Sequence, residues 1–189
     1  MKNYILCDAI KKIALGYLLL HLNINIGSVD LLPGWAGYLL MLYALPNLGK
    51  EEESAKLLIP LCKVLMVISV YSWLNISFFS GILEVEVITM LTTIISLYFD
   101  FQLFTNLATI ASRYGCSQEK GILRLRTVNT LLGTIFAVAT EFYEIAVMEY
   151  ILFGMAIVWV FVSFWFLALL FSLKKELYNV FEADKEVKV

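Results

Sequence analysis

Hydrophobic residues in this chain gather into long blocks that are separated by short polar segments. Blocks near 20 residues match the thickness of the hydrocarbon core of a bilayer, and no sustained period-2 alternation typical of strands is present. The pattern predicts an all-α, polytopic transmembrane helical bundle of six spans, which forms one integral membrane domain over residues 1–189. The predicted spans cover about residues 13–26, 33–48, 57–79, 87–111, 124–146 and 150–173.

The fifth of these blocks is the weakest prediction. Its apolar part, residues 127–140, is too short to cross a bilayer unaided. It becomes long enough if the arginines before it and the glutamates after it reach the two interfaces. If they do not, the chain has five spans.

The basic residues predict how the spans are oriented. The 14 Lys and Arg residues lie before the first block, between the second and third (with Lys63 just inside the third), between the fourth and fifth, and after the sixth. The other three connections contain only acidic charges. Basic residues favour the cytoplasmic side of a membrane. We therefore expect a protein of the cell membrane with both termini in the cytoplasm, and a charged cytoplasmic tail over residues 174–189.

Composition supports a membrane protein and limits the chemistry. The chain is 61% hydrophobic with a mean hydropathy of +0.83, against about 45–50% apolar residues in soluble domains. Cys7, Cys62 and Cys116 have no metal-site spacing, and their odd number argues against a complete disulfide framework. On the predicted topology all three face the cytoplasm, where thiols stay reduced.

A dense cluster of turn signals separates the first two blocks. Gly27 can adopt a positive φ and end the first helix, and Asp30, or Ser28, can cap the next one. Pro33 fits the first turn of that helix, and Gly37 leaves room for a neighbouring helix. We predict a tight hairpin turn here. An alternative interpretation adds a polar pocket at the membrane face.

The segment around this turn resembles a known group of proteins. Residues 22–40, LNINIGSVDLLPGWAGYLL, combine an Asn-rich helix end, a glycine, Asp-x-Leu-Pro and Gly-Tyr. The segment resembles the N-terminal hairpin of small uncharacterised multi-spanning proteins of Gram-positive bacteria, over about residues 13–45. The resemblance implies a bacterial inner-membrane protein, and it brings no catalytic or binding residue with it.

Several polar residues fall inside the predicted spans, where they are costly and usually face the bundle interior. They serve either as interhelical hydrogen bonds, worth roughly 0.6–2 kcal/mol each, or as a polar pocket for an ion or a small solute. Helical rise puts His21 and Asp100 at overlapping depths. We therefore hypothesise that these two face one interior cavity, paired directly or through water. The full candidate pocket is His21, Asn23, Asn25, Asp100, Gln102 and Asn106.

No set of catalytic residues stands out. A single histidine excludes a His-rich metal site, and no phosphate-binding loop, Ser/His/Asp set or nucleic-acid-binding patch is visible. We expect a non-enzyme without metal or cofactor, whose partners are the lipid bilayer and other membrane protein subunits rather than nucleic acid. The expected role is an accessory, regulatory or assembly partner of a membrane complex. The alternative is a small transporter or permease subunit.

Overall fold

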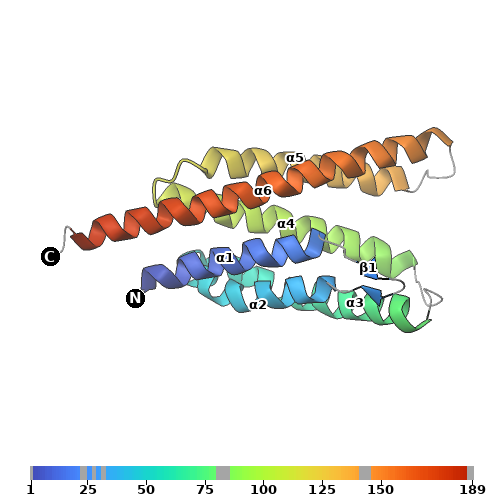
Figure 1. Ribbon diagram of the computed structural model, residues 1–189, viewed down its shortest axis with the longest axis horizontal. Helices are drawn as coiled ribbons and strands as arrows, with labels where there is room; N and C mark the ends of the chain where they lie inside the picture. Colours follow the sequence, from blue (N-terminus) through green and yellow to red (C-terminus); the bar gives the residue numbers. More distant parts are fainter. Residues whose placement is uncertain are drawn as a thin grey trace.

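The computed structural model describes residues 2–21, 25–26, 29–30, 33–79, 86–140 and 146–186. Within these residues the chain forms six α-helices, a short 3₁₀ helix and one pair of two-residue antiparallel strands, and the long helices lie side by side (Figure 1). In chain order the elements are α1 (Lys2–His21), β1 (Asn25–Ile26), β2 (Val29–Asp30), α2 (Gly34–Glu51), η1 (Glu53–Leu57), α3 (Leu58–Phe79), α4 (Glu86–Arg113), α5 (Glu119–Thr140) and α6 (Ala146–Glu186).

The helices form a closed bundle. Each helix packs on the next one in the chain, and α6 returns to pack against α1. The two ends of the chain therefore lie at the same end of the molecule (Figure 1). There the hydroxyl of Tyr4 donates a hydrogen bond to Glu182, and the rings of Tyr4 and Tyr178 meet edge to face at 5.7 Å. This contact joins the beginning of α1 to the end of α6.

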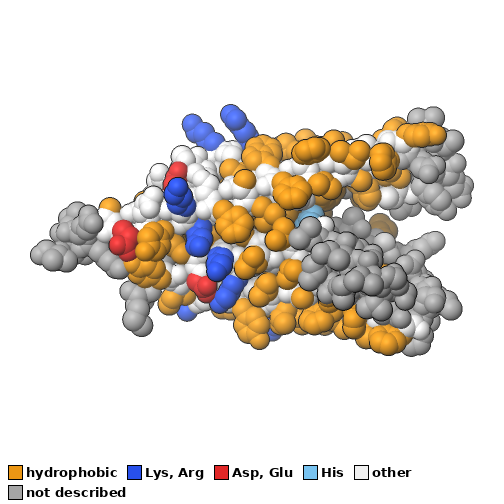
Figure 2. All heavy atoms as spheres, viewed as in Figure 1, with side chains coloured by type: hydrophobic (Ala, Val, Ile, Leu, Met, Phe, Trp, Pro, Cys, Tyr) orange, Lys and Arg blue, Asp and Glu red, His pale blue; other side chains and the backbone are white. Residues whose placement is uncertain are grey.

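Four regions of the described chain are helical, long and apolar enough to cross a membrane. They are Glu53–Ile76, Ile88–Arg113, Glu119–Thr140 and Tyr150–Ala183. On the face in Figure 2, hydrophobic side chains cover the helices, whereas the Lys and Arg side chains gather toward the end where the termini lie. The predicted all-helical bundle is confirmed, and four of its helical regions are candidate membrane spans by length and composition.

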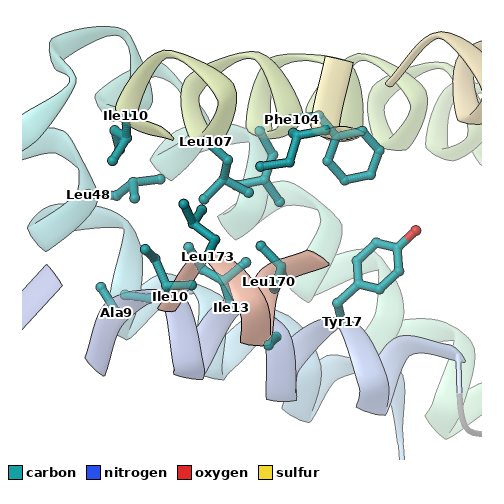
Figure 3. Close-up of a cluster of buried hydrophobic side chains, with 14 of the residues drawn as sticks. Ala9, Ile10, Ile13, Tyr17, Leu48, Phe104, Leu107, Ile110, Leu170 and Leu173 are labelled. Carbon is teal, nitrogen blue, oxygen red and sulfur yellow. The ribbon is translucent and has the colours of Figure 1, made fainter. Parts of the chain in front are cut away.

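The core is built from one face of α1, with α2, α4 and α6 around it. Ile10 and Ile13 of α1 meet Leu170 of α6 and Leu107 of α4, and all four side chains are fully buried (Figure 3). Aromatic rings continue the core toward the opposite end: the Phe166 ring lies 4.4 Å from the rings of both Tyr17 and Phe104. Dense packing of this kind is the main force between helices in lipid, where apolar burial alone gives little.

Two glycines bring α1 and α2 into backbone contact. A Cβ atom added to Gly16 would lie 2.7 Å from the Gly37 carbonyl oxygen, and one added to Gly37 would lie 2.5 Å from the Gly16 carbonyl oxygen. Only residues without a side chain allow so close an approach. The expectation that Gly37 leaves room for a neighbouring helix agrees with this contact, and the neighbour is α1.

The first helix begins and ends earlier than the predicted span of residues 13–26, because it already starts at Lys2. It ends at His21 rather than near Ile26, and Asn25–Ile26 instead pairs with Val29–Asp30. Asparagine side chains compete for backbone hydrogen bonds, and the β-branched Ile26 and Val29 favour extended backbone. Gly27 and Ser28 lie outside the described residues.

The predicted cap of the second helix is also wrong in detail. Asp30 belongs to β2, and the residue at the cap position of α2 is Pro33, whose φ of −63° and ψ of 134° are extended. Pro33 therefore precedes the first helical turn, and no side chain caps it. The helix begins at Gly34.

Two helices continue past their predicted ends. Pro46 lies inside α2, which runs on to Glu51 because Leu45 and Leu48 are fully buried beside it and offset the lost backbone bond. The segment predicted as a charged tail continues α6 to Glu186. Leu173, Leu177 and Phe181, spaced four residues apart, are buried and extend the apolar stripe of that helix.

The fifth predicted span is a helix, but it is displaced in the chain. It covers Glu119–Thr140 rather than residues 124–146. Its first turns carry charges, yet Ile122 and Leu125 are fully buried against the bundle and hold them in the helix. The third and fourth predicted spans agree with α3 and α4 to within two residues at each end.

Candidate functional site

A hydrogen bond between α4 and α5 holds the carboxyl group of Asp100 in the bundle interior. The side-chain amide of Asn129 donates to Oδ2 of Asp100 over 3.2 Å, and Asn129 is only 1% exposed. The carboxyl group therefore lies at the contact between α4 and α5.

A second polar group lies closer to the end of the bundle that carries the termini. Gln102 donates through Nε2 to Oδ1 of Asn106 over 3.0 Å, and the hydroxyl of Ser54 donates to the same oxygen over 2.7 Å. Asn106 is 1% exposed. These bonds tie α4 to η1, the turn that precedes α3.

His21 closes the last turn of α1 and stacks on a neighbouring ring. Its imidazole lies 4.1 Å from the Tyr17 ring, nearly parallel to it, and Nδ1 is 2.9 Å from the Tyr17 carbonyl oxygen. Because a carbonyl can only accept, Nδ1 must carry the hydrogen. In the neutral ring Nε2 is then an acceptor. Among the described residues no ion pair joins His21 to a carboxylate.

A cavity of about 500 Å³ opens beside His21, between α1, α5 and α6. Val160 and Phe164 at its edge are more than half exposed, so the cavity opens on the flank of the bundle rather than at its end. Apart from His21 and Ser163, its walls are apolar. The lining residues are Leu18, His21, Phe136, Ala156, Trp159, Val160, Ser163, Phe164 and Leu167.

The structure distributes the predicted polar pocket over separate places. His21 faces the lateral cavity, Asp100 binds Asn129 of α5, and Gln102 with Asn106 binds Ser54. The ring of Tyr17 stacks on His21 and also packs against Phe104, which lies one helical turn after Asp100 on α4. The side chain of Asn25 and all of Asn23 lie outside the described part of the chain.

Charged side chains form contacts between the α2–α3 connection, the α4–α5 connection and α6, at the end of the bundle that carries the termini. Arg113 forms an ion pair of 2.9 Å with Glu52, and the Tyr114 hydroxyl donates to Glu51 over 2.9 Å. Burial, followed by this bond to Glu51, raises the pKa of Tyr114 to about 12. Glu176 of α6 accepts two bonds from Ser117, through the backbone N–H and the hydroxyl, at 2.9 and 2.7 Å. These contacts link α2, α4 and α6.

Sequence reasoning missed three residues that complete these contacts: Ser54, Asn129 and Ser163. A usable signal existed for Asn129, because it is the one amide side chain in the apolar stretch of residues 127–140. Ser163 had a weaker signal. Its hydroxyl donates to the Trp159 carbonyl over 2.9 Å, as serines commonly do in membrane helices.

Within the described residues no group of three or more His, Cys, Asp or Glu side chains is placed to hold a metal ion. Comparison with protein-family models, curated proteins and solved structures finds no match to this chain. The interior polar contacts and the lateral cavity are therefore the observations from which a function can be argued.

Proposed function

We propose that this chain is a six-span integral membrane protein, with both termini in the cytoplasm, that acts by binding rather than by catalysis. Its role is that of an accessory, regulatory or assembly component of a membrane complex. The observation that carries this proposal is that the polar side chains and the cavity lie in different parts of the bundle. The interior polar groups bind neighbouring helices, whereas the cavity is apolar and opens toward the side.

The arrangement of charges supports the six-span topology. In addition to the four apolar helices, α1 and α2 pack into the same bundle and run along its axis (Figure 1). Lys12 on α1 forms an ion pair of 2.7 Å with Asp8, which lowers the cost of placing both near a membrane. The Lys and Arg side chains gather toward the end of the molecule with the termini (Figure 2), and the distribution of basic residues supports a cytoplasmic location for that end.

The interior contacts support binding over conduction. Asn129 with Asp100, and Ser54 with Asn106, join different helices through side-chain hydrogen bonds. Between these two levels the rings of Tyr17, Phe104 and Phe166 are packed against one another. Such an interior holds helices together, and the space for another molecule lies on the flank.

Photo-crosslinking in the native membrane tests this proposal. A photoreactive residue at Val160, on the cavity, is compared with the same residue at Val158, which is also exposed on α6 but does not line the cavity. We expect a discrete adduct of constant mass from position 160 and only diffuse lipid labelling from position 158. Equal, diffuse labelling from both positions would contradict a binding role for this surface.

A small transporter or permease subunit is the second candidate, and a specific observation favours it. Oδ1 of Asn129 and Nδ2 of Asn106 are buried, and neither atom has a hydrogen-bond partner within the described residues. Buried polar atoms of this kind commonly bind water or an ion. Uptake of protons or radioactive sodium into proteoliposomes, lost in Asp100→Leu, would favour this candidate and exclude the first.

A further inference from the structure

The lateral cavity has the size and character of a ligand site. Its volume of about 500 Å³ falls within the ~300–1,000 Å³ of small-molecule sites, which are mostly apolar with a few placed polar groups. The aromatic rings of Phe136, Trp159 and Phe164 form much of its wall. A hydrophobic molecule that reached it from the bilayer would pass the exposed edge formed by Val160 and Phe164.

The volume favours a lipid chain over a protein helix. A cavity of ~150 Å³ holds benzene, so about 500 Å³ accommodates roughly 20 carbon atoms at the same density. A helix about 10 Å across fills ~420 Å³ with each 5.4 Å turn. The cavity would therefore admit little more than one turn of a partner helix, whereas it would hold most of a long single chain.

The two polar groups in the wall select the chemistry of the head group. Nδ1 of His21 is committed to the Tyr17 carbonyl, which leaves Nε2 of the neutral ring as an acceptor. The hydroxyl of Ser163 donates to the Trp159 carbonyl and its oxygen faces the Tyr17 hydroxyl, so Nε2 of His21 is the polar atom of the wall left for a ligand. A matching ligand brings a hydrogen-bond donor without charge, and the hydroxyl is the smallest such group that a lipid can carry.

We propose that the cavity between α1, α5 and α6 binds a single-chain amphiphile with a hydroxyl head group. The apolar chain lies against Phe136, Trp159 and Phe164, and the hydroxyl donates to Nε2 of His21. This inference rests on the proposed binding function and names its ligand class.

Photolabelling of the purified full-length protein in nanodiscs tests the assignment. The probe is a diazirine-bearing octadecanol, and its methyl ether and the corresponding octadecanoic acid serve as comparison probes. We expect the alcohol to label residues of the cavity wall and to bind about 3–10-fold more tightly than the ether, the range expected for one hydrogen bond. In His21→Leu the alcohol should fall to the affinity of the ether, while the affinity of the ether stays unchanged.

A second pair of variants separates the cavity from the general lipid surface. Ala156→Trp fills the cavity and should abolish labelling of its wall, whereas Val158→Trp adds the same bulk outside it and should leave labelling unchanged. Labelling that survives in Ala156→Trp would overturn the site. Equal binding of alcohol and ether, or a preference for the acid, would overturn the assigned head group.

The two proposals can fail separately. If the alcohol does not label the cavity but a photoreactive residue at Val160 captures one partner protein in the membrane, the ligand assignment falls and the binding function remains. If neither the probe nor a partner is captured at the cavity, both the ligand assignment and the proposed binding function are wrong.

Discussion

The amide of Asn129 on α5 donates to the carboxyl of Asp100 on α4 over 3.2 Å, in the interior of the bundle. Both residues stand on helices that are long and apolar enough to cross a membrane. An unpaired polar group there would lose its hydrogen bonds to water without replacement. The bond therefore stabilises the contact between α4 and α5, and it gives the Asn129 amide hydrogen and the Asp100 carboxyl group a partner.

We predict that Asn129→Leu and Asp100→Leu each lower the free energy of unfolding by ~1–2 kcal/mol, because each leaves the other partner buried without its bond. The double variant should be less destabilised than the sum of the two, since leucine replaces both groups with similar shapes. Unfolding in mixed micelles with increasing SDS gives the free energy of unfolding of the unaltered protein, the two single variants and the double variant. Strict additivity of the two single effects would show that this hydrogen bond does not couple the helices.

The close approach of Gly16 and Gly37 leads to a second prediction. Gly37→Ala places a methyl group about 2.5 Å from the Gly16 carbonyl oxygen. This oxygen belongs to the backbone of a helix, so it cannot easily move away. We expect a loss of ~1–3 kcal/mol in stability from overpacking. The measurement is thermal unfolding in detergent.

Gly154 on α6 provides the control for that substitution. A Cβ atom there meets nothing within 4 Å, so Gly154→Ala should leave stability unchanged or raise it by up to ~1 kcal/mol through helix propensity. If Gly37→Ala behaves like Gly154→Ala, α1 and α2 do not pack through these glycines.

Much of the helical pattern was readable from the sequence because lipid demands long apolar helices. The stripe of Leu173, Leu177 and Phe181 was also present in the sequence, but the charges around it made the segment look like a free tail. The partner of Asp100 was not readable, because it depends on which helices are neighbours and how each is rotated. For the same reason, the sequence could not show that His21 and Asp100 lie in separate places.

The cysteine at the connection between α4 and α5 allows a chemical test of burial. Burial raises the pKa of the Cys116 thiol, and the nearby Glu176 carboxylate raises it further. A raised pKa means that less reactive thiolate is present at any pH below it. We predict that Cys116 reacts with maleimide at least 10-fold more slowly than an introduced cysteine in Ser112→Cys, which is exposed on the same helix end.

The pH dependence sharpens this test. The rate at Ser112→Cys should level off above the ordinary thiol pKa of about 8.5, whereas the rate at Cys116 should still rise at pH 9. Labelled peptides separated by mass spectrometry distinguish the two sites, and denaturation in SDS should make their rates equal. Rapid labelling of Cys116 in the folded protein would mean that the connection does not dock on α6.

The last prediction concerns the six spans and their orientation. Reporter fusions after Asn47, after Gly115 and at the C terminus should read cytoplasmic, and fusions near Asp30, Glu84 and Glu144 should read external. The physical reason is the distribution of Lys and Arg, which avoid the three external connections entirely. A fusion after Asn47 that reads external would show that α1 and α2 do not both cross. A cytoplasmic fusion near Glu144 together with an external C terminus would instead show that α5 does not cross.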